Sequence, residues 1–243
     1  MDKFIKNITP HLDKLSHTML FKGIAPDHIL PILTCLSPQL KIYKKDQLII
    51  NEGDTVNTLL IVISGSVHIQ TLDYWGNLNI KAKIGQYGIF GETFACLDNT
   101  KANCQACTQS ESTILSLDIN TMLYPAKKPN QASTTYDTTT ELPYYNQLLH
   151  NMLNILASKN YMLTQKIDIM NKKTTRDKLI EFLTQQAKLQ GTNNFKIDFN
   201  RQQLADYLAV DRSGLSTEIS KLVQEGIIQT NRNEFTLLNP TIK

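Results

Sequence analysis

The sequence predicts an α+β protein in which a β-rich N-terminal domain is followed by one long helix and then by a small helical domain that ends in a β-hairpin. Three patterns predict this order: short apolar runs separated by glycines over residues 42–117, a heptad repeat over 144–171, and two capped amphipathic helices around a tight corner over 199–222. We expect the domains to span 1–140, 141–172 and 173–243.

Composition is that of an ordinary globular protein. The chain has 243 residues, enough for two domains, of which 41% are hydrophobic and 19% charged. No apolar run approaches the ~20 residues that span a bilayer, and residues 1–15 lack the apolar centre of a signal peptide. We therefore expect a cytoplasmic protein without membrane contact. Four cysteines are too few to cross-link a chain of this length and fit a reducing compartment.

Positive charge is distributed unevenly. Residues 1–140 hold 12 lysines against 12 acidic residues, whereas residues 173–243 hold 10 Lys and Arg against 8 Asp and Glu, a net +2. All four arginines of the chain fall in that last segment. Arginine is the better side chain for bidentate contacts with phosphate and guanine, so this distribution favours nucleic-acid binding by the C-terminal domain.

The N-terminal half combines a helical segment with short strands. Residues 9–37 are expected to be helical with breaks, with Pro26 opening a helix and Cys35 lying in the core. The expected strands are Leu48–Ile50, Thr58–Ile63, Ser66–Thr71, Leu78–Ile84 and Thr113–Leu117. Such strands with frequent glycine turns predict a sandwich or barrel, and Tyr74-Trp75-Gly76-Asn77 is typical of a hairpin tip.

Catalytic and metal-binding patterns are lacking. The sequence suggests no Ser-His-Asp arrangement and no pair of carboxylates, and its histidines show no metal-ligand spacing, so we predict neither an enzyme nor a metal site. Cys104-x-x-Cys107 is a weak redox or metal signal. On a strand, positions three apart point to opposite faces, so we expect one core thiol and one surface thiol.

A long helix is predicted from about Tyr144 to Asn171, after a loop over residues 125–143. Seven residues spaced alternately by four and three positions form what we call the seam: Leu149, Leu153, Leu156, Asn160, Leu163, Ile167 and Met170. A single polar residue at an a position, here Asn160, specifies register in two-stranded coiled coils, so we predict a homodimer. The alternative is a helix packed on its own domain. Five further apolar positions widen the helix face toward that domain: Leu148, Met152, Ile155, Met162 and Ile169.

The C-terminal segment predicts a winged helix. Residues 174–177 (TTRD) are expected to cap a helix from Lys178 to Leu189, which ends at Gly191, and Phe195 to Ile197 are expected to form a short strand. Asn200 with Gln203 has the spacing of a capping box, and Asp211 can cap the next helix, whose buried face is Leu215, Ile219 and Leu222. Gly226 ends that helix, and two short strands around residues 231–233 follow.

Polar residues near the start of the second helix suit the major groove of DNA. The expected DNA-binding residues are Arg201, Gln202, Asp211, Arg212, Ser213, Ser216, Thr217, Lys221 and Arg232. We expect Arg212 to read a base and Arg201 to contact a phosphate. An ordinary helical hairpin with a solvated polar face is the alternative.

Several motifs in this order resemble the Crp/Fnr family of bacterial transcription regulators. They are Asn51-Glu52-Gly53-Asp54, residues 63–67 (ISGSV), residues 85–92 (GQYGIFGE) and the helix from Arg212 to Leu222. The resemblance implies a jelly-roll sensor domain, a homodimer, and sequence-specific binding of double-stranded operator DNA, with RNA polymerase as a further candidate partner. It also implies an effector pocket in the phosphate-binding segment 91–106, at Gly91, Glu92, Thr93, Lys101 and Ala102.

Departures from the family pattern mean that the identity of the effector cannot be taken from the resemblance. Lys101-Ala102 stands where cAMP-binding members have Arg followed by Ser or Thr, and residues 1–175 contain no arginine to replace it. We therefore expect no cyclic nucleotide. Iron–sulfur or haem signatures are lacking too, because no cysteine precedes Cys35. Ser213 and Thr217 replace a Glu and an Arg of the cAMP receptor type, which predicts a different operator. The alternative function is a small-molecule or redox-sensing protein whose C-terminal helices contact other proteins.

Overall fold

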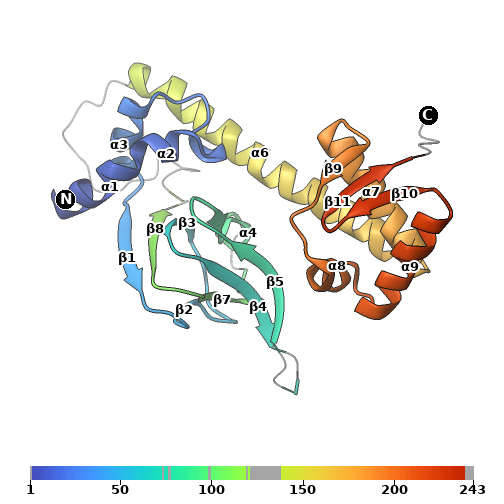
Figure 1. Ribbon diagram of the computed structural model, residues 1–243. Helices are drawn as coiled ribbons and strands as arrows, with labels where there is room; N and C mark the ends of the chain where they lie inside the picture. The colour runs from blue at the N-terminus through green and yellow to red at the C-terminus, as the bar shows by residue number, and fades with distance from the viewer. Residues whose placement is uncertain are drawn as a thin grey trace. The chain divides into compact units, whose positions relative to one another are not determined.

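The computed structural model describes residues 2–72, 74–75, 78–97, 100–118, 120 and 138–238. The chain forms two compact units, Met1–Leu156 and Ala157–Lys243, and helix α6 (Thr138–Met170) runs from the first into the second (Figure 1). The α+β class is confirmed, as is the order of β-domain, long helix and winged helix. None of the helices among the described residues is long and apolar enough to cross a membrane.

Short helical turns precede the β-domain. They are α1 (Asp2–Ile8), the 3-10 turn η1 (Thr9–His11), α2 (Leu12–Ser16), the 3-10 turn η2 (Met19–Phe21) and α3 (Pro26–Cys35). Pro26 lies in the first turn of α3, as predicted, where its missing N–H costs no hydrogen bond. The prediction that Cys35 lies in the core is wrong. Ile29 and Leu33 form the buried side of α3, and Cys35, two positions after Leu33, is exposed.

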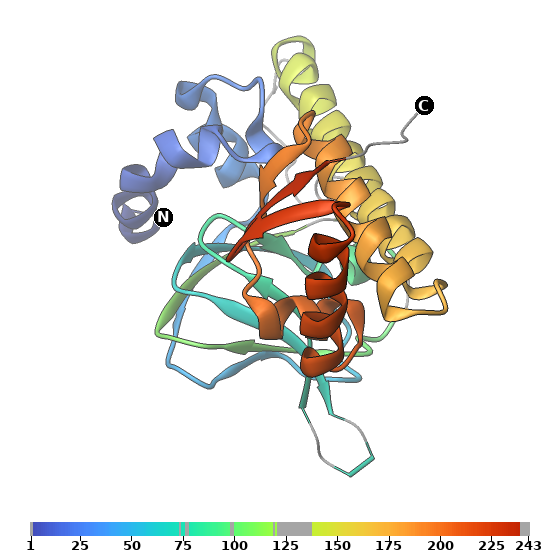
Figure 2. The ribbon, with the colours of Figure 1, turned by 45° about the vertical axis from the view of Figure 1, so that its right-hand side comes forward.

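Eight antiparallel strands form a jelly roll of two sheets. The first sheet has the order β1 (Gln39–Tyr43), β8 (Ser112–Asp118), β3 (Thr58–Ser64), β6 (Ile89–Phe90), and the second the order β2 (Leu48–Ile50), β7 (Gln105–Thr108), β4 (Val67–Leu72), β5 (Leu78–Ile84). This interleaving of strands 1-8-3-6 with 2-7-4-5 is that of a double Greek key. All five predicted strands are present. The β4–β5 hairpin projects beyond the sandwich in both views (Figures 1 and 2).

Strands β1, β6 and β7 were not among the runs predicted from sequence. β6 has only two residues, and β7 reads Gln-Ala-Cys-Thr, without an aromatic or branched aliphatic side chain. These strands are recognised through their pairing: β7 lies between β2 and β4, and β6 pairs with β3. Such contacts are tertiary, so local β-propensity carries little of the signal.

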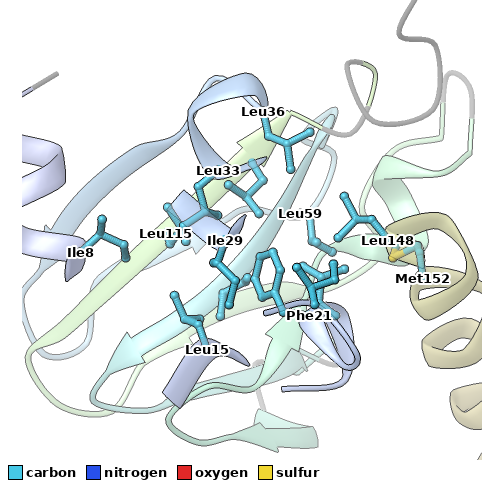
Figure 3. Close-up of a cluster of buried hydrophobic side chains, with 14 of the residues drawn as sticks. Ile8, Leu15, Phe21, Ile29, Leu33, Leu36, Leu59, Leu115, Leu148 and Met152 are labelled. Atoms are coloured by element: carbon cyan, nitrogen blue, oxygen red, sulfur yellow. The ribbon is translucent and has the colours of Figure 1, made fainter. Parts of the chain in front are cut away.

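Strand β3 of the first sheet is buried on both faces. Leu59 and Ile61 of β3 point to a core that also contains Phe21 and Leu115 (Figure 3). Intervening residues of β3 point to a second core between the sheets, with Phe90. Residues 59–63 therefore read as a continuous apolar run rather than as an alternating one.

Helix α6 packs on this first core through the residues that the sequence indicated. Leu148, Met152 and Ile155 are buried there. Met162, predicted to widen the same face, is instead 66% exposed. The next buried position along the helix is Ile169, which packs in the core of the second unit. The helix also begins earlier than predicted, at Thr138.

Two sequence predictions concern residues that the structure describes only in part. The helix was predicted to begin at about Tyr144, but the backbone is already helical at Pro143, although proline lacks the N–H of one helical hydrogen bond. The expected loop is thus shortened to residues before 138, and its residues 125–137 lie outside the described part of the chain. In the expected hairpin tip, Gly76 and Asn77 lie outside it as well.

The second unit is a small three-helix domain with a three-stranded sheet. Its elements are α7 (Thr175–Gln190), β9 (Asn194–Lys196), α8 (Arg201–Leu208), α9 (Arg212–Gln224), β10 (Ile228–Asn231) and β11 (Glu234–Leu237), with the sheet order β10-β11-β9. Phe182, Leu204, Leu215, Leu222 and Phe235 are buried together in its core. In Figure 2, α9 lies below the β10–β11 hairpin, which we call the wing. The predicted helix pair and hairpin are confirmed.

Candidate nucleic-acid interface and effector site

The corner between α8 and α9 is held by two caps and a left-handed residue. The N–H of Gln203 donates to Asn200 Oδ1 and the N–H of Asn200 donates to Gln203 Oε1, both at 2.9 Å, which completes the predicted capping box. Ala209 ends α8 with φ of 49°. Asp211 then caps α9 by accepting the N–H of Gly214 at 2.9 Å. These local bonds set the entry of α9 and so the direction of its first side chains.

Helix α9 has one buried and one exposed side. Leu215, Ile219 and Leu222 are buried, as predicted. The polar residues predicted to face DNA are exposed: Arg212, Ser213, Ser216, Thr217 and Lys221. A surface helix with this division can enter a major groove with its N-terminal residues toward the bases.

The predicted DNA-binding cations differ in what they already contact. Lys221 Nζ lies 2.7 Å from Glu218 Oε1. Within the described residues, Arg212 on α9 and Arg232 on the wing have no hydrogen-bonded or ion-paired side-chain partner. These two guanidinium groups are therefore available to an external anion or base edge.

Arg201 lies differently from the sequence expectation of a phosphate contact. Its guanidinium carbon is 5.1 Å from the centre of the Phe235 ring, and Nη2 donates to Thr230 Oγ1 at 3.2 Å. Burial lowers the pKa of Arg201. Both partners belong to the wing, so Arg201 joins the start of α8 to the β10–β11 hairpin.

The wing is tied to the rest of its unit at the turn. Arg232 adopts a positive φ of 53° there. Asn233 Nδ2 donates to the Ile197 carbonyl at 3.1 Å, and the Ile197 N–H donates to the Asn233 carbonyl at 2.9 Å. Arg232 is thus exposed at the tip of a hairpin whose turn is held to Ile197 through Asn233. Gln202, another expected contact, donates from Nε2 to Asp206 Oδ1 at 2.8 Å and is exposed.

One ion pair of this domain was missed by sequence reasoning. Arg176, at the start of α7, makes a bidentate pair with Glu225, the C-cap of α9, with Nη1 to Oε1 at 2.8 Å. The hydrogen bonds between the two groups raise the pKa of Arg176 and lower the pKa of Glu225. The partners are 49 residues apart, so no local pattern could have paired them.

The candidate effector site has its predicted residues on two segments. Gly91, with φ of 83°, precedes the one-turn helix α4 (Glu92–Ala95), and Glu92 is 3% exposed. Thr93 Oγ1 donates to Glu92 Oε1 at 3.2 Å. The second segment, Lys101-Ala102, pairs with residues 53–55, and Lys101 is exposed.

Ala102 occupies a position unsuited to an anion. It is 3% exposed in the core between the sheets. Its N–H donates to the Asp54 carbonyl and its carbonyl accepts from the Gly53 N–H, both at 2.8 Å. The backbone of Ala102 is therefore already hydrogen-bonded, and its side chain has no hydroxyl to offer.

The cysteines near this site do not behave as predicted. Cys104 and Cys107 are both buried, whereas sequence reasoning placed one of them at the surface. That prediction was wrong because Cys104 precedes β7, in a bend, so strand alternation does not relate the two. Burial raises the pKa of both thiols, which disfavours the reactive thiolate. Within the described residues no group of three His, Cys, Asp or Glu side chains is arranged to hold a metal ion.

The seam on α6 is largely open to solvent. Leu153 is 65%, Leu163 63% and Ile167 57% exposed, and Asn160 is exposed as well. Leu149, Leu156 and Met170 are half-buried. Of the seam, Leu149 and Met170 also pack against the cores of the chain's own units, whereas Leu153, Leu163 and Ile167 belong to neither core.

Comparisons with known proteins match both domains. The family model described as the cyclic nucleotide-binding domain matches residues 40–124, and that described as the Crp-like helix-turn-helix domain matches residues 177–241. No curated protein matches the sequence significantly.

Solved structures of low sequence identity share the fold. The catabolite activator protein of Thermus thermophilus has 21% identity over 90% of this chain and 93% of its own, with a TM-score of 0.50. The c-di-GMP responsive global regulator CLP of Xanthomonas campestris has 16% identity, coverage of 88% and 100%, and a TM-score of 0.54. CprK in complex with OCPA has 12% identity, coverage of 86% and 91%, and a TM-score of 0.55.

Proposed function

Because the chain belongs to the Crp/Fnr family of transcription regulators, we propose that it acts as a homodimer that binds a specific DNA operator through helix α9 of each subunit. The observation that carries the proposal is the exposed N-terminal end of α9, where Arg212 follows the Asp211 cap. Functionally, we divide the chain into a sensor domain (1–140), a dimerisation helix (141–172) and a DNA-binding domain (173–243).

Arg212 is the base-reading residue in this proposal. It is the first residue of α9 and its guanidinium has no partner among the described side chains. A guanidinium that donates to O6 and N7 of one guanine contributes about 1–3 kcal/mol of discrimination. Arg232 at the tip of the wing would contact the neighbouring phosphates or minor groove, which positions the domain without choosing a sequence.

Homodimerisation rests on the exposed seam. Three large apolar side chains on one line of a helix, each more than half exposed, are unfavourable in water and are covered when two such helices pair. Asn160 at the centre of the seam would select the in-register, two-stranded arrangement. RNA polymerase stays a candidate partner once the dimer is on its operator.

The sensor domain is proposed to respond to something other than cAMP or cGMP. A cyclic phosphate needs a cation and free N–H groups at the cassette. Here Lys101 replaces the arginine, and the Ala102 N–H is already donated to Asp54. The raised pKa values of Cys104 and Cys107 also disfavour thiol-based redox sensing at these two positions.

The test is binding to DNA selected by the protein from random sequence, measured by fluorescence anisotropy at several salt concentrations. We expect Arg212→Ala to weaken binding to the selected operator about 5–150-fold while random DNA is affected much less. Lys173→Ala, which removes an exposed cation between α6 and α7, is the matched control. Failure to select any sequence, or an unchanged ratio of operator to random binding in Arg212→Ala, would contradict the proposal.

A further inference from the structure

The exposed side of α9 is lined by hydroxyl groups whose hydrogens are already in use. Ser216 Oγ donates to the Arg212 carbonyl, Thr217 Oγ1 to the Ser213 carbonyl and Ser220 Oγ to the Ser216 carbonyl, each at 3.0 Å. Ser213 Oγ donates to the Asp211 carboxylate that caps the helix. We call these four residues, Ser213, Ser216, Thr217 and Ser220, the hydroxyl face.

A hydroxyl has one hydrogen and two lone pairs. When the hydrogen is donated to the carbonyl one turn earlier, as serine and threonine in helices commonly do, the oxygen can only accept a further hydrogen bond. Ser213, Thr217 and Ser220 follow each other at four and three residues, so their oxygens lie along one line opposite the buried Leu215, Ile219 and Leu222. The hydroxyl face therefore presents a row of acceptors.

Donors near this row are few. Lys221 is held toward Glu218 at 2.7 Å, and Gln202 donates to Asp206. Arg212, at the N-terminal end of the row, is the side chain that can donate to a base without first losing a partner among the described residues. The reading surface thus has a strong donor at one end and acceptors along its centre.

We propose that the hydroxyl face makes the protein choose bases that carry an exocyclic amino group next to the guanine read by Arg212. In the major groove the amino groups are adenine N6 and cytosine N4, whereas guanine and thymine present acceptor oxygens at the corresponding edge. Opposite an acceptor row, adenine or cytosine forms a hydrogen bond, and guanine or thymine leaves two acceptors face to face. The inference rests on the proposed function and names the base class that this interface selects.

Phosphate is the competing ligand for these hydroxyls. A phosphate oxygen is an acceptor, so each hydroxyl would have to give up its bond to the helix or to Asp211 before it could donate. The present hydrogen-bond pattern favours the amino groups because all four existing bonds remain intact.

The experiment starts from the operator selected by the wild-type dimer. At the positions adjoining the guanine on the same strand we expect adenine or cytosine. Each is then replaced by an analogue without the amino group, purine deoxyriboside for adenine or 2-pyrimidinone deoxyriboside for cytosine. One lost hydrogen bond lowers affinity about 2–10-fold. Thr217→Val keeps the methyl group but removes the oxygen, and Ser213→Ala removes the other hydroxyl. In these variants, the analogue at the base opposite the altered residue should cause no further loss of affinity.

The outcomes separate this inference from the proposed function. If Arg212→Ala abolishes operator preference but every analogue binds wild type as well as the natural base does, the function stands and the inference fails. The inference also fails if Thr217→Val and Ser213→Ala weaken operator and random DNA equally, because that is the behaviour of phosphate contacts. Circular dichroism of both variants checks that α9 is intact.

Discussion

A single carboxylate, that of Asp211, caps the N-terminal end of α9, the end that we propose to read bases. It accepts hydrogen bonds from the Ser213 hydroxyl and from the Gly214 N–H, and these bonds, that of Ser213 first, lower the pKa of Asp211. The cap also directs the Ser213 hydroxyl hydrogen away from the solvent side of the helix. Asp211 therefore links the stability of α9 to the proposed base recognition.

The lowered pKa of Asp211 gives stability a defined pH dependence. A depressed folded-state pKa contributes stability that is present above the unfolded pKa, about 3.9, and is lost as pH falls through the folded value. We expect the stability difference between wild type and Asp211→Ala, measured by urea unfolding, to shrink between pH 7 and pH 3. The difference between Asp211→Asn and Asp211→Ala should stay constant, because an amide caps without titrating. A stability difference between wild type and Asp211→Ala that is the same at pH 7 and pH 3 would contradict a lowered pKa of Asp211.

Arg201 has a packing role that its sequence position did not reveal. Its guanidinium lies over Phe235 and bonds Thr230, so we expect Arg201→Ala to destabilise the C-terminal unit by about 0.5–2 kcal/mol in urea unfolding. Arg201→Lys should recover only part of this, because an ammonium lacks the planar stacking surface. If both variants are as stable as wild type while the salt slope of DNA binding falls by about one unit, the phosphate role predicted from sequence is the correct one.

Local bonds explain why some residues of the site could be predicted and others could not. The caps at Asn200 and Asp211 lie within three residues of their partners, so sequence spacing suffices to find them. Arg201 and Arg176 meet partners 29 and 49 residues away, which only the folded chain brings together. The hydroxyl residues were predicted at the interface, but the acceptors that lie within hydrogen-bond distance of their oxygens are known only from the structure.

At the scale of elements, the sequence periodicity of α6 predicted which residues pack on the first unit but not a buried polar contact of the same helix. The heptad predicted a dimer seam, which remains a prediction, and the apolar residues beside it predicted the packing of Leu148, Met152 and Ile155 on the first unit, which is confirmed. The sequence did not reveal Asn151, a buried polar residue at the contact between α6 and the turn η2. Its Nδ2 donates to the carbonyls of Leu20 at 2.9 Å and Lys22 at 2.8 Å, and Gln147 donates to its Oδ1.

Replacing Asn151 should loosen this attachment. Asn151→Leu has a similar volume but leaves two carbonyls without their donor, at a cost of about 1–3 kcal/mol in urea unfolding. Asn154→Leu, at an exposed position of the same helix, is the control and should change stability little. Equal stability of the two variants would show that water replaces Asn151 at no cost.

The phosphate-binding segment can be tested as one element. We expect isothermal titration calorimetry to detect no binding of cAMP or cGMP at micromolar concentrations, because the segment lacks an arginine and its Ala102 N–H is committed to Asp54. The expectation came from the family resemblance and the Lys101-Ala102 pair, and the structure adds the hydrogen bond between the Ala102 N–H and the Asp54 carbonyl in its support. Micromolar binding of either nucleotide would mean that Lys101 and the remaining N–H groups suffice.

At the scale of the whole molecule, one chain leaves the seam uncovered. Leu153, Leu163 and Ile167 contribute nothing to either core, yet their spacing is regular over the length of the helix. Composition predicted two domains and a nucleic-acid-binding C-terminus but could not locate the partner of this surface, because burial against a second copy leaves no mark on a single sequence other than its period.

Charged substitutions in the seam should dissociate the dimer, whereas the same substitutions elsewhere on α6 should not. Leu156→Lys with Leu163→Lys places charges at two d positions and should convert the dimer into monomers by light scattering. Tyr161→Lys with Met162→Lys is the matched control, since it adds the same charge at exposed positions outside the seam and should remain dimeric. The seam variant should also lose operator affinity, because two linked half-site contacts bind more tightly than one. A seam variant that is folded by circular dichroism and still dimeric would require another interface, and one that is monomeric but binds the operator at full strength would show that a single α9 carries the recognition.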